Sequence, residues 1–426
     1  MLKLSKKNHP VIAFFMGLLS VNNIAYTFVV GTTPIMVSCV YAVVCLLYLL
    51  LIHDKSLIYT IYNIPQQLWL FLLFVFLSFV TIAVIHYQYL YQWLVGVVQL
   101  LLYCSIALLV ATLSNNKNDL LDGIFWGIII NFGFVVYSYL MYRRGVIFSL
   151  NDVFPAVHMK VLYIGNTFRG WGLFREPGHL MRYLCVLSFI VWDRVTYRPV
   201  IYKVMLFLSL AVLIMLSISS AVIFFLLGIV IFINLNGKRN YKIFIGSIIL
   251  LVAIVVLTIA LSKRNQFVSL LVASFEGGLL DIFITSGGNA TRYSGFDYVF
   301  RIIKKYPIIG SGWNTLTQEF INEGYYGVGK VRGSYSEGLS LIAEMGIFCI
   351  PFFVFICKSI IKTGKSKNSF SNALCTCLIM YILLLFATDY SIDAGAAILI
   401  GLTMLSFRMG GQFDGIDELD KKNSIS

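Results

Sequence analysis

Long hydrophobic runs recur from one end of the 426-residue chain to the other, and they constrain the fold more than any other feature. Each holds about 17 to 25 mostly apolar residues, the length that an α-helix needs to cross about 30 Å of hydrocarbon. Only 12% of the residues are charged, against about 25% in soluble proteins. The runs predict an all-α polytopic membrane protein, a single integral membrane domain over residues 1–426 with about twelve transmembrane helices. The approximate spans are 11–30, 35–52, 68–86, 93–113, 122–142, 178–192, 200–217, 219–235, 242–262, 337–357, 371–388 and 391–408.

Three of these spans are less well defined than the others: the first resembles a signal peptide, and the seventh and eighth are not clearly separated. The first follows Lys3, Lys6 and Lys7 like a signal peptide, but it is long and has no Ala-x-Ala site, so we expect it to be retained. The seventh and eighth spans are joined through SISS at 217–220, with little to separate them. An error at that junction would invert the orientation of everything that follows.

Basic residues set the expected orientation. An even number of spans puts both termini on one side, and the segments assigned to that side carry Lys and Arg: the N-terminal tail, 236–242 and 358–367. The short segments assigned to the opposite side carry none: 31–34, 87–92, 218 and 389–390. By the positive-inside rule both termini, including the tail 409–426, are expected to be cytoplasmic.

Two long loops then lie outside, at 143–177 and 263–336, and together they hold 13 Lys and Arg residues. This is the opposite of the usual trend, although long loops cross a membrane largely regardless of charge. The charge is open to two interpretations, a surface attracted to anionic headgroups or a site for an anionic substrate. Arginines beside glycines and aromatic residues favour the second, because a diphosphate needs Arg forks and backbone N–H groups while sugars need aromatic faces.

The first loop ends in the stretch GNTFRGWGLFREPGHLMRYL at 165–184. We predict that Arg169, Arg175 and Arg182 bind a diphosphate and that Trp171 stacks on sugar. Pro177 suits the first position of the next helix, whose positive dipole end would point outward. The alternatives are that Arg182 snorkels to the interface and that the other charges pair with one another.

The second loop contains a further candidate helix, SGFDYVFRIIKKYP at 294–307, with Pro307 as its stop. Its expected apolar stripe is Phe296, Val299, Phe300 and Ile303, which predicts a helix lying on the membrane surface.

Arg301 on the other face of this helix is a candidate diphosphate ligand, or it simply pairs with Asp297. A glycine turn with Trp313, a second candidate for sugar stacking, follows at 308–315. A Gly- and Tyr-rich segment at 324–335 then carries Arg332, another candidate diphosphate ligand.

These stretches carry a resemblance to a known family. The order of Arg169, Gly172, Glu176 and Pro177 resembles the R-x-x-G-x-x-x-E-P stretch of bacterial O-antigen and capsule repeat-unit polymerases. TRYSGFDYVFRIIKKYPIIGSGWNT followed by GSYSEGLSLIAEMGIFCIP resembles the large external loop and next span of the O-antigen polymerase and ligase superfamily.

The chain departs from the ligase pattern at one point. The resemblance implies that in ligases of this superfamily a histidine of the large loop, within an H-N-x-x-L motif, acts in catalysis. Tyr335 and Ser336 stand where His and Asn would be, and no histidine follows His179. The resemblance therefore favours a polymerase over a ligase.

The resemblance implies transfer of a growing glycan from undecaprenyl diphosphate to an incoming lipid-linked repeat unit at the outer face of the bacterial cytoplasmic membrane. Arginines could stabilise the diphosphate leaving group, so no cofactor and no metal are expected. Glu176 and His179 are the predicted catalytic residues, and Glu337 and Asp389 are further candidates for the base.

The expected partners are the lipid-linked donor and acceptor glycans and membrane lipid, with a chain-length regulator and a flippase implied by the family and no nucleic acid. The rival interpretation is a lipid-linked oligosaccharide flippase, which also commonly has twelve spans. The absence of a half-chain repeat argues against it.

Overall fold

The computed structural model describes residues 9–20, 26–30, 33–85, 87–146, 168, 170–174, 177–217, 221–236, 298–323, 336–366, 368–387 and 393–409. Its α-helices are α1 (Pro10–Leu19), α2 (Val37–Leu51), α3 (Lys55–Tyr62), α4 (Gln66–Ile85), α5 (Leu90–Thr112), α6 (Lys117–Arg143), α7 (Pro177–Thr196), α8 (Val200–Ser217), α9 (Val222–Asn236), α14 (Leu316–Asn322), α15 (Glu337–Met345), α16 (Ile350–Lys365), α17 (Ser369–Ala387) and α18 (Ala394–Met409). Short 3-10 turns are η1 (Tyr87–Tyr89), η2 (Ser114–Asn116) and η5 (Gly346–Cys349), and the strands are β1 (Tyr26–Val30) and β2 (Thr33–Met36).

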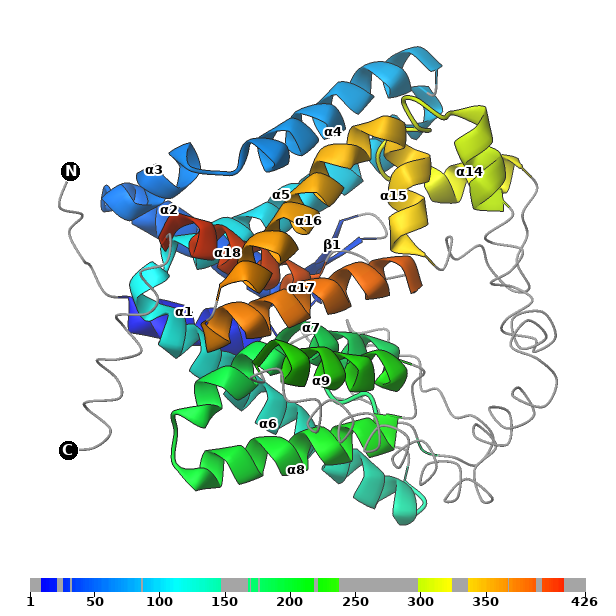
Figure 1. Ribbon diagram of the computed structural model, residues 1–426. Helices are drawn as coiled ribbons and strands as arrows, with labels where there is room; N and C mark the ends of the chain where they lie inside the picture. Colours follow the sequence, from blue (N-terminus) through cyan, green and yellow to red (C-terminus); the bar gives the residue numbers. More distant parts are fainter. Residues whose placement is uncertain are drawn as a thin grey trace.

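The prediction of an all-α polytopic membrane protein is confirmed. Among the described residues, six helical segments are long and apolar enough to cross a membrane, or seven if the bent pair α2 and α3 forms one span. The shorter helices α1, α9 and α18 are also apolar. Most helices run side by side in one bundle (Figure 1).

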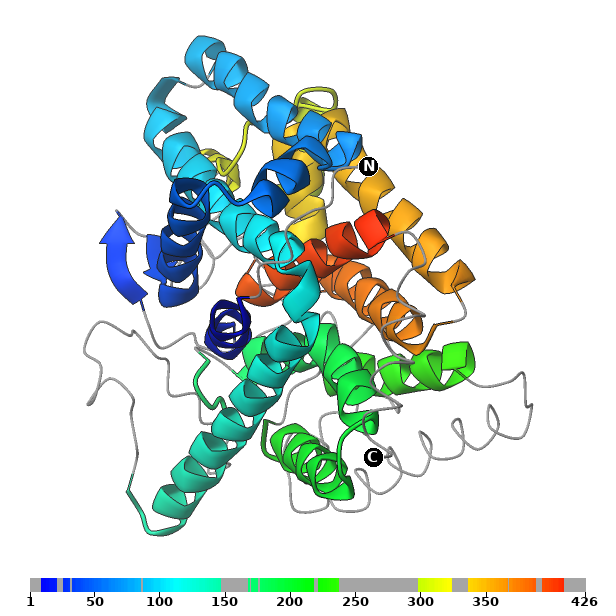
Figure 2. The same ribbon diagram turned by 90° about the vertical axis from the view of Figure 1, so that its left-hand side faces the viewer.

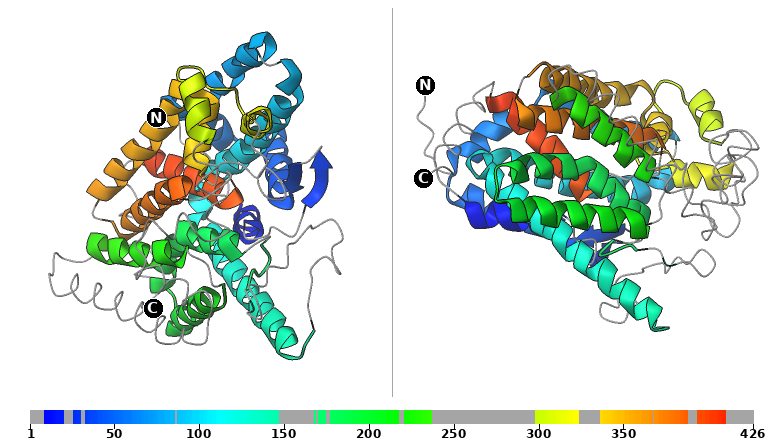
Figure 3. Two further views of the ribbon diagram at one scale, coloured as in Figure 1. Left: turned by 90° about the vertical axis from the view of Figure 1, so that its right-hand side faces the viewer. Right: turned by 60° about the horizontal axis from the view of Figure 1, so that its bottom comes forward.

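The bundle has two distinguishable ends. We call one the terminal end, because α1 begins there, with His9 bonded to Asn116 at the start of α6 and close to Asp54 between α2 and α3. The C-terminal helix α18 finishes at the same end, where Phe407 packs on Lys362 of α16. The opposite end, which carries residues 298–323, is the loop end. Figure 2 views the bundle from the terminal end and Figure 3, left, from the loop end.

The helix α7 lies at the centre of the bundle. Fifteen of its twenty residues are buried, and it packs against α6, α8, α9, α17 and α18. Because α7 carries Arg182, Asp193 and Arg194, it is less apolar than the other long helices, and it is shielded by protein along its length. Charged residues inside a membrane are expected to face the interior of a bundle in this way.

The first predicted span, 11–30, is wrong in its second half. The helix ends at Leu19, and Tyr26–Val30 forms a strand that pairs antiparallel with Thr33–Met36. The run YTFVV consists of β-branched and aromatic residues, which favour strands, and its hydrophobicity alone could not distinguish a strand from a helix.

The uncertain junction between the seventh and eighth spans is resolved as two helices, α8 and α9. The carbonyl of Leu216, near the end of α8, accepts a bond from Gly170 at the loop end. The end of α9 lies at the terminal end, where Asn372 of α17 bonds to Leu235 and Asn236. The predicted span 242–262 lies outside the described residues, between α9 at the terminal end and residue 298 at the loop end.

The predicted span 337–357 is longer than expected and is interrupted. It runs as α15, η5 and α16 to Lys365. The interruption is at Gly346, whose φ of +54° suits glycine. A side chain there would also meet the carbonyl oxygen of Ile308, 2.3 Å from an added Cβ.

Residues 298–323 form a small folded unit that we call the cap. It consists of a helix at 298–305, a glycine turn at 308–315 and α14. Its own core contains Val299, Ile302, Leu316 and Phe320, together with Ala343 of α15. Of the predicted apolar stripe, Val299 is buried in this core and Phe300 is 50% exposed, because the buried face of the helix is turned toward Val299 and Ile302. That the helix lies on the membrane surface stays a prediction. The predicted member Phe296 lies outside the described residues.

Candidate functional site

The stretch before α7 is fixed to α6 by a buried asparagine. The Asn131 side chain is fully buried, and its Oδ1 accepts a bond of 2.8 Å from the backbone N–H of Leu173. Gly172 has a φ of +57°, and a Cβ there would lie 2.5 Å from the same oxygen. Gly172 therefore allows the backbone of this stretch to lie close to α6. Together with the bond to Asn131, this contact fixes the position of the stretch just before α7 begins.

The helix α7 begins at Pro177, as predicted, and this start lies at the loop end. Arg182 follows less than two turns later and is only 7% exposed. A snorkelling arginine would extend its charged group to water, so the burial argues against that alternative. His179 lies three residues earlier, on the same side of α7, and is half-buried.

Tyr183, the next residue on α7, connects three helices. Its hydroxyl lies 2.9 Å from the Ser20 hydroxyl at the end of α1, and its ring packs at 5.3 Å from the ring of Phe174. Its ring also lies 3.2 Å from where a Cβ on Gly395 would be, in the first turn of α18. The same added Cβ would lie 3.2 Å from Oδ1 of Asp393, so Tyr183 and Asp393 are neighbours.

Tyr381 of α17 is fully buried and lies near two carboxylates. Glu337, at the start of α15, and Asp393, before α18, are both close enough to interact electrostatically with its hydroxyl. The start of α15 is packed closely on α17, because a Cβ on Gly338 would lie 2.8 Å from the ring of Phe386.

Arg182 and Tyr381 lie at a similar depth in the bundle. The antiparallel helices α7 and α17 bring Cys185 and Cys377 close together. Arg182 is three residues from Cys185 and Tyr381 four residues from Cys377, in each case about one helical turn toward the loop end.

We call Ser20, Tyr183, Glu337, Tyr381 and Asp393, together with Arg182 at a similar depth on α7, the loop-end cluster. Three helices, α7, α15 and α18, begin around it, and their positive dipole ends favour anions. Two of these helix starts already carry carboxylates, with Asp393 capping α18 through a 2.9 Å bond from the Ala396 N–H and Glu337 in the first turn of α15. A buried arginine, two carboxylates and tyrosine hydroxyls can bind a phosphate group and accept a proton from a sugar hydroxyl.

The other predicted site residues stand as follows. Arg169, Arg175, Glu176 and Arg332 lie outside the described residues, as does the candidate base Asp389.

Arg301 is exposed on the cap, with its guanidinium 5.0 Å from the centre of the Tyr298 ring. Its role as a diphosphate ligand stays a prediction.

The two tryptophans predicted to stack on sugar are both buried. Trp171 is 3% exposed, packed beside Phe168, and Trp313 is 9% exposed, with its ring 6.0 Å from that of Phe71 in α4. In this structure Trp313 acts as an apolar anchor that attaches the cap to the bundle. Sugar stacking on either ring stays a prediction.

Sequence reasoning missed Ser20, Tyr183 and Tyr381, because serines and tyrosines are common in apolar spans and carry little signal there. Sequence reasoning also missed Asp393, which caps α18. An Asp immediately before an apolar run is the usual signal for an N-cap and could have identified it.

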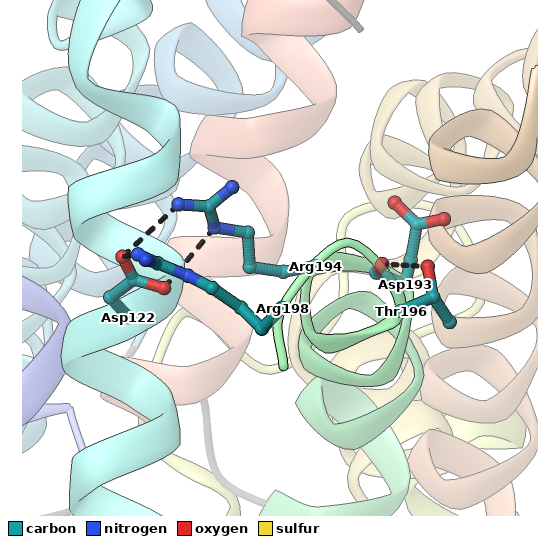
Figure 4. A network of polar contacts seen from close by, with 5 residues as sticks. All are labelled: Asp122, Asp193, Arg194, Thr196 and Arg198. Carbon is teal, nitrogen blue, oxygen red and sulfur yellow. Dashed lines mark hydrogen bonds and ion pairs between the residues drawn. The ribbon is translucent and has the colours of Figure 1, made fainter. Parts of the chain in front are cut away.

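A second polar network lies at the terminal end (Figure 4). Arg194 of α7 donates from Nε and Nη2 to the two carboxylate oxygens of Asp122 in α6, at 3.1 and 3.2 Å. Arg198 also pairs with Asp122. Beside them, Asp193 accepts a 2.5 Å bond from the Ser369 hydroxyl at the start of α17. This network ties α6, α7 and α17 together.

A bundle of long apolar helices with a polar cluster buried at one end is the architecture of an integral membrane protein. Residues 204–354 match the family model described as O-antigen ligase. Over these residues, about a third of the chain, the protein is similar to the O-antigen ligase and polymerase superfamily, whose members are glycosyl-transfer enzymes of the bacterial inner membrane. No curated protein matches the chain.

Proposed function

We propose that the protein polymerises undecaprenyl-diphosphate-linked oligosaccharide repeat units into O-antigen or capsular polysaccharide at the outer face of the cytoplasmic membrane. The observation that carries the proposal is the buried Arg182 close to the start of α7, in a cluster that also contains two carboxylates. An ionisable residue inside a span costs about 2.5 to 3.5 kcal/mol on insertion scales, so its presence favours a functional role.

In the proposed reaction the acceptor hydroxyl attacks the anomeric carbon of the donor glycan. A carboxylate or imidazole accepts the hydroxyl proton, the new glycosidic bond forms, and the bond to the diphosphate oxygen breaks. The electron pair leaves with the lipid diphosphate, whose charge is stabilised by Arg182 together with Arg169 and Arg175. Glu176, His179 and Glu337 are the candidates for the proton acceptor.

Arginine suits this role better than lysine, because a planar guanidinium binds two phosphate oxygens at once. Replacing Arg169 and Arg175 with lysine is therefore expected to reduce activity at normal protein levels in the membrane. Full polymerisation with lysine at both positions would remove these residues from the proposed site.

The deciding experiment uses purified protein with synthetic lipid-linked repeat units and measures glycan length on a gel. Products longer than one repeat, attached to lipid diphosphate, support the polymerase. Transfer of a glycan only to a lipid A-type acceptor would identify the alternative, an O-antigen ligase. A flippase would move the substrate between the leaflets of a vesicle without changing its length.

The ligase alternative shares the family match, since the matched model is described as O-antigen ligase. Against it stands the sequence departure at Tyr335 and Ser336, where the ligase pattern has His and Asn. The polymerase proposal rests on that departure and on the resemblance of the stretch before α7.

A further inference from the structure

A carboxylate at the end of α15 attaches the cap to the bundle. Glu344 accepts bonds from two backbone N–H groups of the cap, from Asn314 to Oε2 at 2.9 Å and from Leu316 to Oε1 at 3.1 Å. Leu316 is the first residue of α14, and Thr315 makes no side-chain capping bond there. Glu344 therefore supplies, from another helix, an acceptor for one of the N–H groups at the start of α14 that have no partner within the helix.

The backbone around Glu344 is joined to the same turn. The N–H of Ser311 donates to the Ala343 carbonyl and that of Gly312 to the Glu344 carbonyl, each at 2.9 Å. Gly310 has a φ of +69°, and a Cβ there would lie 2.2 Å from backbone atoms of Glu344. The glycine turn and the last turn of α15 thus form one closely fitted unit.

The cap is also attached to the neighbouring helices. The Asn314 side chain donates a 2.7 Å bond to the carbonyl of Gln92 in α5, and Asn322 bonds to the Tyr89 hydroxyl. Trp313 reaches Phe71 of α4. From the loop end, the cap lies over α4, α5 and α15, away from α8 and α9 (Figure 3).

Glu337 and Glu344 mark the two ends of α15. They are seven residues apart, which places them on the same face of the helix, about 10 Å apart along its axis. Glu337 belongs to the loop-end cluster, while Glu344 holds the cap. A displacement of the clamped end of this nine-residue helix would therefore move Glu337 relative to Tyr381.

We propose that Glu344 is a positioning residue for glycosyl transfer. It clamps the glycine turn to α15 and so holds Glu337 in its place beside Tyr381. This inference rests on the proposed function, and it adds a residue that does not contact substrate and acts through α15.

The test compares Glu344→Gln with Glu323→Gln. The first change keeps the size of the side chain but turns one of the two accepting oxygens into a donor that faces a backbone N–H. The second makes the same chemical change in an exposed ion pair of the same cap, where Glu323 bonds Lys305 at 2.9 Å. Each variant is purified with and without Ser311→Cys in a Cys357→Ser background, since Cys357 is exposed.

Ser311, in the glycine turn of the cap, is fully buried, so its cysteine replacement reports whether the turn is docked on α15. We expect Glu344→Gln to raise the rate of labelling by a polar thiol reagent at least about tenfold, because local opening exposes the thiol. We expect kcat to fall at least about tenfold while KM for the lipid-linked donor changes less than about threefold, since small misplacements of reacting groups reduce turnover strongly. Glu323→Gln should leave both measurements unchanged.

Two results would overturn the inference. One is a loosened turn with normal kcat, which would separate the clamp from the reaction. The other is a lost kcat with the Ser311→Cys thiol still protected, which would mean that Glu344 acts by another route. If Glu344→Gln does not accumulate in the membrane, Glu344→Asp replaces it, with smaller changes expected in the same two measurements and the same contradicting results.

The proposed function is checked separately by the unmodified protein. If that protein does not extend lipid-linked glycans, both the proposed function and this inference are wrong. If it extends them and Glu344→Gln behaves like Glu323→Gln, only the positioning role is wrong.

Discussion

The two ends of α7 carry arginines in very different surroundings. Arg194 at the terminal end meets both oxygens of the Asp122 carboxylate, and Arg198 shares that partner. Arg182, twelve residues and about 18 Å away along the helix, is buried near the start of α7 at the loop end, next in sequence to Tyr183 of the loop-end cluster. The first arrangement neutralises charge between helices, and the second places a buried arginine at the end of the bundle where α7, α15 and α18 begin.

This contrast separates a structural role from a functional one within a single helix. A bidentate arginine–carboxylate pair has its geometry satisfied inside the protein and mainly stabilises it. Groups gathered around helix N-termini favour an added anion. Substitutions at the terminal end should therefore affect stability, and those at the loop end should affect turnover.

The largest expected effect is at Arg182. Replacing it with Gln should abolish long glycans and reduce kcat/KM about 100-fold or more, because hydrogen bonds to charged groups contribute about 1.5 to 3 kcal/mol each. Glycan length by gel and the yield of detergent-extracted protein are measured together, with Ser188→Ala, a buried change elsewhere on α7, as the control. If Arg182→Gln makes glycans of the same lengths as the unmodified protein, Arg182 has only a structural role.

The next effect identifies the proton acceptor. Glu337→Gln, Glu176→Gln and His179→Gln are compared, and one of them should reduce kcat about 100-fold, the lower range for general-base catalysis. We expect it to be Glu337, since its charge acts on Tyr381 within the loop-end cluster. A loss confined to Glu176→Gln would instead move the reacting centre to the stretch before Pro177.

A smaller effect is expected at the terminal end. Arg194→Gln removes two bonds to Asp122, which retains Arg198, so the free energy of unfolding should fall by about 1 to 2 kcal/mol. Thermal unfolding in detergent measures this loss, and kcat per folded molecule should stay within about twofold. Loss of turnover with unchanged stability would break the distinction between the two ends.

The smallest effect on activity is expected for two surface substitutions that test how the bundle is oriented in the membrane. Lys304 in the cap and Lys365 at the end of α16 are both exposed, one at each end of the bundle. In a Cys357→Ser background, Lys304→Cys should react with an impermeant thiol reagent in intact cells and Lys365→Cys should not, as the distribution of basic residues predicts. The opposite pattern would put the loop-end cluster on the cytoplasmic side and exclude the proposed reaction there.

Hydrophobic run length determined much of the fold by itself. The runs behind α4, α5, α6, α8 and α17 predicted these helices to within a few residues, because only a helix satisfies backbone groups across hydrocarbon. The same signal failed at Tyr26–Val30, where local β-propensity and strand pairing prevailed. It also failed to show the interruption at Gly346, which depends on contact with the distant Ile308.

The candidate site was only partly visible in the sequence. Arg182 and His179 could be identified, because a charge inside an apolar run is unusual. Tyr183, Tyr381, Asp393 and Glu337 come from four different helices, and their proximity depends on how α7, α15, α17 and α18 pack.

The sequence by itself determined that this chain spans a membrane and where its unusual charges lie, since both follow from the local transfer free energy of each segment. The tertiary structure alone decided that Arg194 is neutralised by Asp122 and that Arg182 is buried at the loop end. It also decided that Trp313 anchors the cap and Glu344 clamps it. These roles depend on contacts between residues far apart in the chain, and hydrophobic patterning specifies which face of a helix is apolar without specifying its neighbour.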